Sequence, residues 1–326
     1  MVKCLIMARH HYVPQFYLRN FCCADKANAI FVYERNKKPF PSNISNVAAP
    51  NDFYSARDEK TGEKDETIEL FFSQLESAAK PIFEKIIKKQ STKLSKQERL
   101  TLSHFFGFLF VRNKTFRQKT KNLYSEIMKQ TMAFAAHDKD RFRKMLEKSG
   151  AKFKTEKEFE ETRLFALHGE YDIGFKGEEH FIGATLTHAK DLSPIFWGKS
   201  WKLLTVDSSR VFVTSDNPMF LAPHEKQRPR WYGLGLLEAD IFLPLTPNLV
   251  LMMTNNKNWP DKLNLTRKQV KSINTSVSKF ASKFIFSNID SRDISSIFDK
   301  TREGESEKVS VGDSFIEPRL KGQGKS

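Results

Sequence analysis

Cysteine is scarce in this sequence. Its 326 residues include three cysteines, Cys4, Cys22 and Cys23, and the last two are adjacent. An odd number of cysteines at these positions forms neither a disulfide framework nor a Cys-x-x-Cys pair. Because disulfides persist in oxidising compartments, we expect a protein made in a reducing one.

Long apolar runs are absent as well. No stretch of the chain approaches the roughly 18 apolar residues of a membrane-spanning helix. The opening MVKCLIMARHH contains an apolar stretch of five residues, which is too short for the core of a signal peptide. No segment joins a basic face to interfacial aromatic residues, as membrane-surface helices do. We therefore expect a cytoplasmic protein that has no membrane partner.

Acidic residues are outnumbered. Asp and Glu total 39 against 54 Lys and Arg, which gives a formal net charge of +15. Such an excess concentrates polyanions near a protein and speeds encounter with them. Small lysine clusters at 85–96 and 114–129 fit a nucleic-acid partner, and a well-solvated lysine-rich surface explains them equally well. The sequence leaves both interpretations open and does not predict an oligomeric state.

Helical patterns dominate the first half of the chain, which is rich in phenylalanine. Apolar residues recur at helical spacing from Thr67 for about five turns, and Pro81 is expected to kink this helix or split it. Ser95 and Glu98 have the spacing of a capping box that opens the next helix. With 29 phenylalanines in the chain, we expect aromatic packing between the helices.

Strand-like runs dominate the second half. AIFVY at 29–33 is an early strand, and WKLLTV, RVFVTS, DIFLPL and NLVLMM follow within 200–253. A helix from Arg267 to about Lys283 precedes a last strand, FIFS. The pattern predicts an α+β fold, with a helical N-terminal half packed against a mainly antiparallel β-sheet from the C-terminal half. We expect a single domain over 1–298 and a disordered charged tail over 299–326.

The segment RHHYVPQFYLRNFC at 9–22 combines polar and bulky apolar residues. Pro14 suits the first position of a short helix, which places Gln15 and Arg19 on one side of it. His10 and His11 precede this helix, near its N-terminus, where anions are favoured. Adjacent side chains diverge, so at most one of the two histidines faces a site, and the other is a structural group.

The HHYVP motif also resembles the opening of HNH endonucleases, in which a histidine activates water beside a metal ion. That metal module needs a later asparagine and a ligand histidine within about forty residues. After His11 the next histidine is His104, so the spacing argues against an ordinary HNH nuclease.

Two charged positions in the helical half are candidates for a site. Glu69 and Glu76 are seven residues apart and share a helix face, and Glu69 flanks the apolar stripe. Arg112 stands among apolar residues and needs a carboxylate or a bound anion as its partner. A solvated helix face for the glutamates and a structural ion pair for Arg112 are the alternatives.

A second compact polar cluster is FVTSDNPMFL at 212–221. Pro218 favours an extended conformation at Asn217, and Asp216 follows the expected end of a strand. A carboxylate there suits a metal ligand or a general base. An Asx-type turn, in which Asp216 bonds nearby backbone, explains the same residues.

Several motifs occur together in one order. They are HHYVPQFYLRNF, FYS at 53–55, the glutamate-bearing helix at 67–76, Arg112, TSDNP and PLTPNLVL. This set resembles the bacterial family known as domain of unknown function 4238, over residues 10–288. The resemblance transfers no catalytic residue, because no activity comes with the family. It implies that these separated polar residues belong to one domain and meet in one pocket.

Three hypotheses follow from these residues. The first is metal-assisted hydrolysis of a phosphodiester in nucleic acid. Its catalytic residues would be His10, His11, Glu69 and Asp216. The metal ion, Mg²⁺ or Mn²⁺, would be held by His11 and Asp216. Phosphate or substrate would be bound by Gln15, Arg19, Asn20, Arg112 and Asn217. The second is a protein that binds nucleic acid or ribonucleoprotein without catalysis. The third is a structural or regulatory protein in which the polar residues form a buried network.

Overall fold

The computed structural model describes residues 11–48, 56–57, 64–65, 67–112, 114–173, 179–207, 209–222 and 238–301. By its internal contacts the chain divides into two compact units. Unit 1 comprises 1–114 and 182–326, and unit 2 comprises Thr115–Phe181. The predicted tail lies almost wholly outside the described residues, so the domain boundary at 298 stays a prediction.

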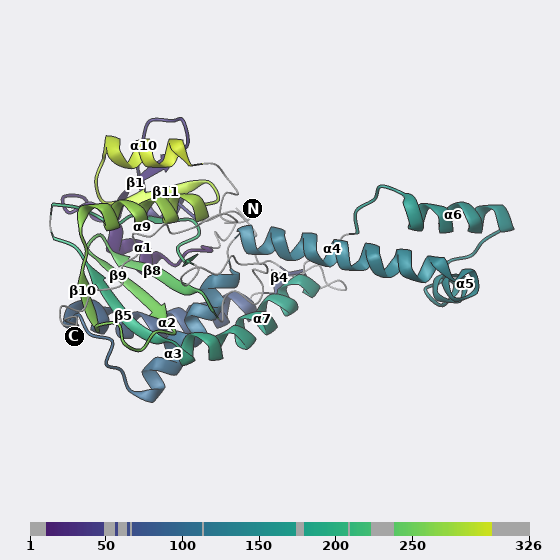
Figure 1. Cartoon of the computed structure of the whole chain (residues 1–326), viewed down its shortest axis with the longest axis horizontal. Coiled ribbons are helices and arrows are strands. Elements are labelled where there is room, and N and C mark those ends of the chain that lie inside the picture. Colours follow the sequence, from purple (N-terminus) through teal and green to yellow (C-terminus); the bar gives the residue numbers. More distant parts are fainter. Residues whose placement is uncertain are drawn as a thin grey trace, which may run out of the picture. The chain divides into compact units, whose positions relative to one another are not determined.

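Unit 1 contains eight helical elements among the described residues (Figure 1). They are α1 (Gln15–Leu18), η1 (Arg19–Phe21), η2 (Ile44–Asn46), α2 (Thr67–Lys89), α3 (Lys96–Val111), α7 (Glu179–Gly198, which begins just before the boundary), α9 (Arg267–Phe280) and α10 (Arg292–Lys300). Unit 2 has α4 (Lys114–His137, which begins at the boundary), α5 (Lys139–Lys148) and α6 (Glu156–His168). None of the described helices is both long enough and apolar enough to span a membrane.

The strands of unit 1 form two main sheets. Their bounds are β1 (Ala29–Glu34), β2 (Phe40–Asn43), β3 (Ala56–Arg57), β4 (Lys64–Asp65), β5 (Ser200–Thr205), β6 (Thr214–Ser215), β7 (Phe220–Ala222), β8 (Asp240–Thr246), β9 (Leu249–Thr254), β10 (Lys262–Asn264) and β11 (Phe284–Ser287). One sheet has the order β2-β1-β11-β6 and the other β10-β5-β9-β8-β7, while β3 and β4 form a separate pair. All pairs are antiparallel except β10 with β5, so the predicted α+β fold is confirmed.

The five-stranded sheet is buried on both faces. Leu203, Leu243 and Leu251 contribute to a first core, which also contains residues of α1, α2 and α3. The alternating residues Leu204 and Phe242 contribute to a second core with α9 and α10. Figure 1 shows α2 and α3 on one side of this sheet and α9 and α10 on the other. Burial on both faces explains why these strands read as continuous apolar runs in the sequence.

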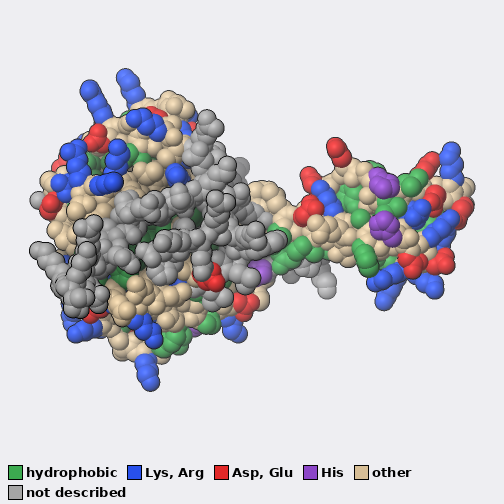
Figure 2. All heavy atoms as spheres, viewed as in Figure 1, with side chains coloured by type: hydrophobic (Ala, Val, Ile, Leu, Met, Phe, Trp, Pro, Cys, Tyr) green, Lys and Arg blue, Asp and Glu red, His purple; other side chains and the backbone are tan. Residues whose placement is uncertain are grey.

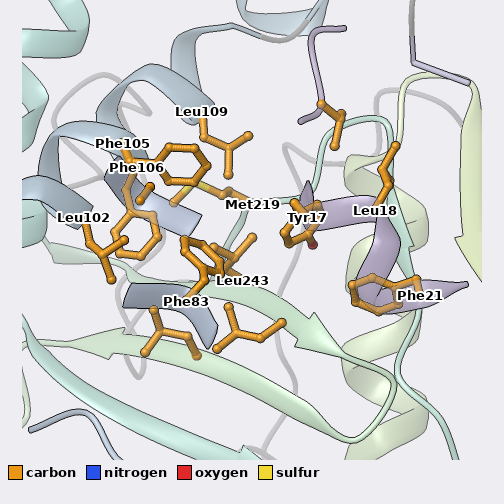
Figure 3. Packing of buried hydrophobic residues seen from close by; sticks show 14 of the residues in the cluster. Tyr17, Leu18, Phe21, Phe83, Leu102, Phe105, Phe106, Leu109, Met219 and Leu243 are labelled. Atoms are coloured by element: carbon orange, nitrogen blue, oxygen red, sulfur yellow. The ribbon is translucent and has the colours of Figure 1, made fainter. Parts of the chain in front are cut away.

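Aromatic side chains fill the first core, as the sequence predicts. Figure 3 shows Phe83, Phe105 and Phe106 together in this core. The Phe83 and Phe105 rings lie 5.3 Å apart, edge to face, and the Phe106 ring lies 5.3 Å from the Trp201 ring. Helix α2 continues through Pro81, so of the two expected outcomes, a kink or a split, the split does not occur. Proline removes only one helical hydrogen bond, and the neighbouring Phe83 anchors the helix in the core.

Several boundaries agree with the sequence and others differ. The capping box at Ser95 is present, with both reciprocal hydrogen bonds to Glu98. Pro14 occupies the N-cap of α1 and not its first helical position. The predicted RVFVTS strand is reduced to Thr214–Ser215, because the Asn274 side chain bonds the backbone of Val211 and Val213 in place of a strand partner.

The phenol of Tyr17 joins the N-terminal helix to both main sheets. Its hydroxyl donates to the Pro244 carbonyl in β8 at 2.7 Å and lies 2.6 Å from the Thr214 hydroxyl in β6. Since the single phenol proton is given to Pro244, Thr214 must donate to Tyr17. The side chain is fully buried, so no water can replace either partner without a rearrangement.

We expect Tyr17→Phe to lower the free energy of unfolding by about 1–3 kcal/mol, because it leaves two buried polar groups without their partner. Urea denaturation of Tyr17→Phe, Thr214→Val and the double variant measures this. The double variant should lose less than the sum of the single losses. Additive losses would show that the two hydroxyls do not interact.

Candidate functional site

The N-terminal motif is built into the first core. Tyr12, Val13, Tyr17, Leu18 and Phe21 are all buried. The preceding backbone is fixed by a hydrogen bond from the Tyr12 amide to the Ala48 carbonyl at 3.0 Å. The apolar half of the motif therefore packs the interior, and the polar half emerges at its edge.

His11 lies at this edge and is partly buried. The Gln15 side-chain amide lies 3.2 Å from Nε2 and 3.4 Å from Nδ1 of the imidazole, so it donates to a ring nitrogen. Burial lowers the pKa of His11 below its usual value of 6.5, while the backbone at Ser45 opposes the shift and the Arg112 charge adds to it. The imidazole is therefore neutral near pH 7.

Arg112 connects this edge to the helical layer. It caps α3, and its guanidinium donates to a Glu76 carboxylate oxygen of α2 at 2.5 Å and to the His11 carbonyl. The guanidinium also stacks 4.4 Å from the centre of the Phe72 ring. Of the two partners predicted for Arg112, the structure shows the carboxylate. Three segments are thereby held by one buried cation.

An aromatic wall adjoins this cation. Phe108 of α3 lies 5.0 Å from Phe71 and 5.8 Å from Phe72, in both cases edge to face. Phe71 remains 41% exposed, whereas Phe72 and Phe108 are buried. The resulting group of His11, Gln15, Glu76 and Arg112 beside this wall is called the His11 cluster below.

Asp216 has a different set of partners. Its carboxylate accepts hydrogen bonds from the backbone amides of Ser282 (2.8 Å), Lys283 (2.8 Å) and Phe284 (3.2 Å). The residue is 1% exposed, so these amides compensate for the burial of its charge. They also account for the end of α9 at Phe280, three residues before the predicted end, because residues 282–284 turn towards the carboxylate.

Asn217 acts beside Asp216 on the same turn. Its side-chain amide donates to the Phe280 carbonyl at the end of α9, and its backbone amide donates to the Ser215 hydroxyl. The TSDNP motif thus binds the connection between α9 and β11. This geometry differs from the expected Asx-type turn, because the Asp216 and Asn217 side chains bond backbone that is distant in sequence.

Tyr12 brings the two polar groups close to each other. Burial raises the pKa of Tyr12, and the Asp216 charge raises it further. Arg112 donates to the His11 carbonyl, and the next residue, Tyr12, is the one whose pKa the Asp216 charge raises. The two halves of the chain therefore meet at the motif, but His11 and Asp216 have separate partners.

Of the remaining predicted site residues, some lie away from the His11 cluster and others are outside the part of the chain that the structure describes. Arg19 is exposed and donates to Asn28 at 3.3 Å in the turn before β1, and Asn20 is partly exposed beside it. His10 lies outside the described residues. Glu69 lies in α2, but its side chain is outside the described part. Their roles stay predictions.

The described hydrogen-bond partners of His11 and Asp216 are protein groups. Both carboxylate oxygens of Asp216 accept backbone amides, and the His11 ring is held by Gln15. Within the described ranges no three His, Cys, Asp or Glu side chains are grouped as a metal site requires. The predicted Mg²⁺ or Mn²⁺ site stays a prediction, and no reaction step is derived through it.

The sequence-based site set omits one central residue, Glu76. The sequence does indicate Glu76 as a candidate, because Glu76 shares a helix face with Glu69 and Arg112 requires a carboxylate partner. Choosing between the two glutamates needs the α2–α3 packing, which places Glu76 against Arg112.

We expect Arg112→Lys to lower the free energy of unfolding by about 1–3 kcal/mol, because an ammonium cannot reproduce the planar bridge to Glu76 and the His11 carbonyl. Urea denaturation measures the loss. Arg19→Lys is the matched control, since Arg19 is exposed and has one neutral partner. Equal effects of the two substitutions would contradict the bridging role of Arg112.

The lowered pKa of His11 predicts a pH dependence of stability. Between the folded pKa and 6.5 the unfolded chain binds a proton that the native protein does not, so this stabilisation is complete above pH 6.5 and is lost on acidification. His11→Gln should therefore show a weaker fall in the free energy of unfolding from pH 7 to pH 5 than the wild type. His137→Gln, at an exposed histidine, is the matched control.

Comparisons with known proteins give one result. The family model described as protein of unknown function DUF4238 matches residues 9–291. No curated protein and no solved structure matches the chain. The match spans the N-terminal motif, the His11 cluster and the TSDNP motif, in agreement with the resemblance over residues 10–288. The chain belongs to the DUF4238 family.

Proposed function

We propose that the protein binds nucleic acid through a basic surface of unit 1. The observation that carries this proposal is the set of exposed basic side chains on α9, α10, the β1–β2 turn and the α9–β11 connection. This surface, called the α9–α10 basic face, comprises Lys37, Lys38, Arg267, Lys268, Lys271, Lys283, Arg292 and Lys300. In Figure 2 blue side chains outnumber red ones over α9 and α10.

The positive charge of the chain is unevenly divided. Unit 2 has 14 Lys and Arg against 12 Asp and Glu, a net charge of 14 − 12 = +2. Unit 1 therefore carries 15 − 2 = +13. A polyanion is attracted to the concentrated charge far more than to the near-neutral unit.

Amphipathic helices present the basic face. Val270, Ile273 and Val277 of α9 are buried in the second core, which directs Lys268 and Lys271 to solvent. Ile294 and Phe298 anchor α10 in the same core. The face is therefore supported by packed helices.

Arg35 fixes the position of these elements. Its guanidinium donates to the Ser278 carbonyl of α9 and to the Thr301 carbonyl after α10, and it stacks 4.3 Å from the Phe298 ring. One side chain directly after β1 thereby holds the ends of both helices. Basic groups on such a support can contact successive phosphates without a large loss of conformational entropy.

Most cations of the basic face form no ion pair in the described part of the chain, although Asp293 and Asp299 lie on the same helix, α10. Glu34 pairs with Lys37 at 2.9 Å and with Lys283 at 3.5 Å, whereas no ion pair involves the other six side chains. In unit 2, by contrast, Lys139, Arg143 and Arg163 are all paired with glutamates. Unpaired, solvated cations are the groups that release counterions on binding phosphate.

We expect the triple variant Lys268→Gln, Lys271→Gln, Lys300→Gln to bind a labelled single-stranded or duplex oligonucleotide at least about tenfold more weakly. The slope of log affinity against log salt should fall by about one for each phosphate contact that is lost. Fluorescence anisotropy over a salt series measures both quantities.

The matched control is Lys89→Gln, Lys93→Gln, Lys96→Gln, which removes three exposed lysines from the end of α2, the connection and the start of α3. Binding should persist in this control. An equal loss in both variants would show that total charge, and not the α9–α10 basic face, governs binding. Absence of salt-dependent binding by the wild type would remove the proposal.

Metal-assisted hydrolysis is tested by a cleavage assay. The wild type and His11→Ala are incubated with DNA and RNA in the presence of Mg²⁺, Mn²⁺ or EDTA. We expect no metal-dependent product. Cleavage that needs the metal and disappears in His11→Ala, while the variant remains folded, would replace the binding proposal with the hydrolase hypothesis.

A further inference from the structure

Unit 2 has a small core of its own on one side of α4. Ala135 and Ala136 of α4 are buried with Phe142 of α5 and Phe159 of α6. Ion pairs from Lys139 and Arg143 to Glu156 also join α5 to α6. These contacts use the C-terminal part of α4 and leave its opposite face uncovered by this core.

That opposite face of α4 carries a row of large apolar side chains. Leu123 is 60% exposed, Ile127 49% and Phe134 70%. At about 100° per residue these positions fall within about 40° of one another around the helix axis. They point away from Ala135 and Ala136, so α4 has two apolar faces. The second one, with Gln130 included, is called the outer face of α4.

The spacing of the outer face is that of a helix-pairing surface. Leu123, Ile127, Gln130 and Phe134 follow one another at intervals of four, three and four residues. This is the alternation of a and d positions in a coiled coil, and a single polar residue among them specifies register. A solvated helix surface does not require its apolar residues to follow this alternation.

The pattern also suits a second copy of the same helix. Read in the opposite direction, the intervals are again four, three and four, so an antiparallel copy presents the same arrangement. In this register Leu123 of one copy lies opposite Phe134 of the other, and Ile127 lies opposite Gln130. Each layer then contains at least one large apolar side chain.

Charge favours a second copy over a polyanion or a strongly charged protein on this face. Unit 2 has a net charge of +2, from 14 basic and 12 acidic residues, so two copies repel each other weakly here. In the antiparallel register Tyr124 flanks Thr131, and Glu126 flanks Ala133. No like charges are opposed beside the apolar row.

We propose that the protein self-associates through the outer face of α4, as an antiparallel pair of α4 helices from two copies. This inference goes beyond nucleic-acid binding and does not depend on it, because it uses unit 2 and apolar contacts. The row spans three turns of one helix, which is a small interface, so the dimer dissociates on dilution.

Sedimentation velocity of the full chain tests the proposal over about a hundredfold range of protein concentration. The wild type should shift from monomer to dimer as concentration rises. Ile127→Glu should weaken this association by at least about tenfold, because it places a charge in the centre of the apolar row. Circular dichroism shows that the variant remains helical.

Met128→Glu is the matched control. Met128 is the next residue and is 44% exposed, close to the 49% of Ile127, but it lies about 100° around the helix. This variant should associate as the wild type does. A wild type that remains monomeric at every concentration overturns the proposal, as does equal weakening by the two variants. A monomeric wild type whose melting temperature falls in Ile127→Glu would show instead that another part of the same chain covers the row.

Discussion

The fold of unit 1 depends on the buried carboxylate of Asp216. A charge that is 1% exposed is tolerated only where hydrogen bonds replace its water, and three consecutive backbone amides do so here. Those amides end α9 and lead into β11, whose neighbours are β1 and β6. The same carboxylate lies near Tyr12 of the N-terminal motif. This side chain thus fixes the connection between α9 and β11.

The residues that resemble an active site in the sequence satisfy other buried polar groups in the structure. Arg112 binds a carboxylate and a main-chain carbonyl, and Asn217 binds the end of a helix. Aspartate, arginine and histidine serve equally well as catalysts and as partners for interior backbone. Their presence in one motif therefore does not separate the two roles. The hydrogen bonds that each side chain already makes within the protein are what distinguish the two roles.

Local signals made much of the fold predictable from the sequence. The capping box at Ser95 and the strand at 29–34 depend on neighbours in the chain, and they occur as expected. The outcomes that could not be predicted depend on distant contacts: Asn274 replaces a strand partner, and Glu76 meets Arg112 because α2 packs on α3. The helical unit 2 is a further example, since its boundaries are defined by which residues contact one another in the folded chain.

The two units present surfaces that respond to solution conditions in opposite ways. Salt screens the cations of the α9–α10 basic face and reduces the gain from counterion release. Contacts along the outer face of α4 involve apolar area, which salt does not weaken and excluded salts strengthen. Because the charge of the chain is concentrated in unit 1, association through unit 2 would bring two basic surfaces together without placing charge at the contact. Two linked sites on one polyanion bind more tightly than either alone, provided that the linker lets both reach it. The separation of charge from apolar surface is therefore the physical condition under which a small, weak interface could raise the affinity of a basic protein for a long nucleic acid.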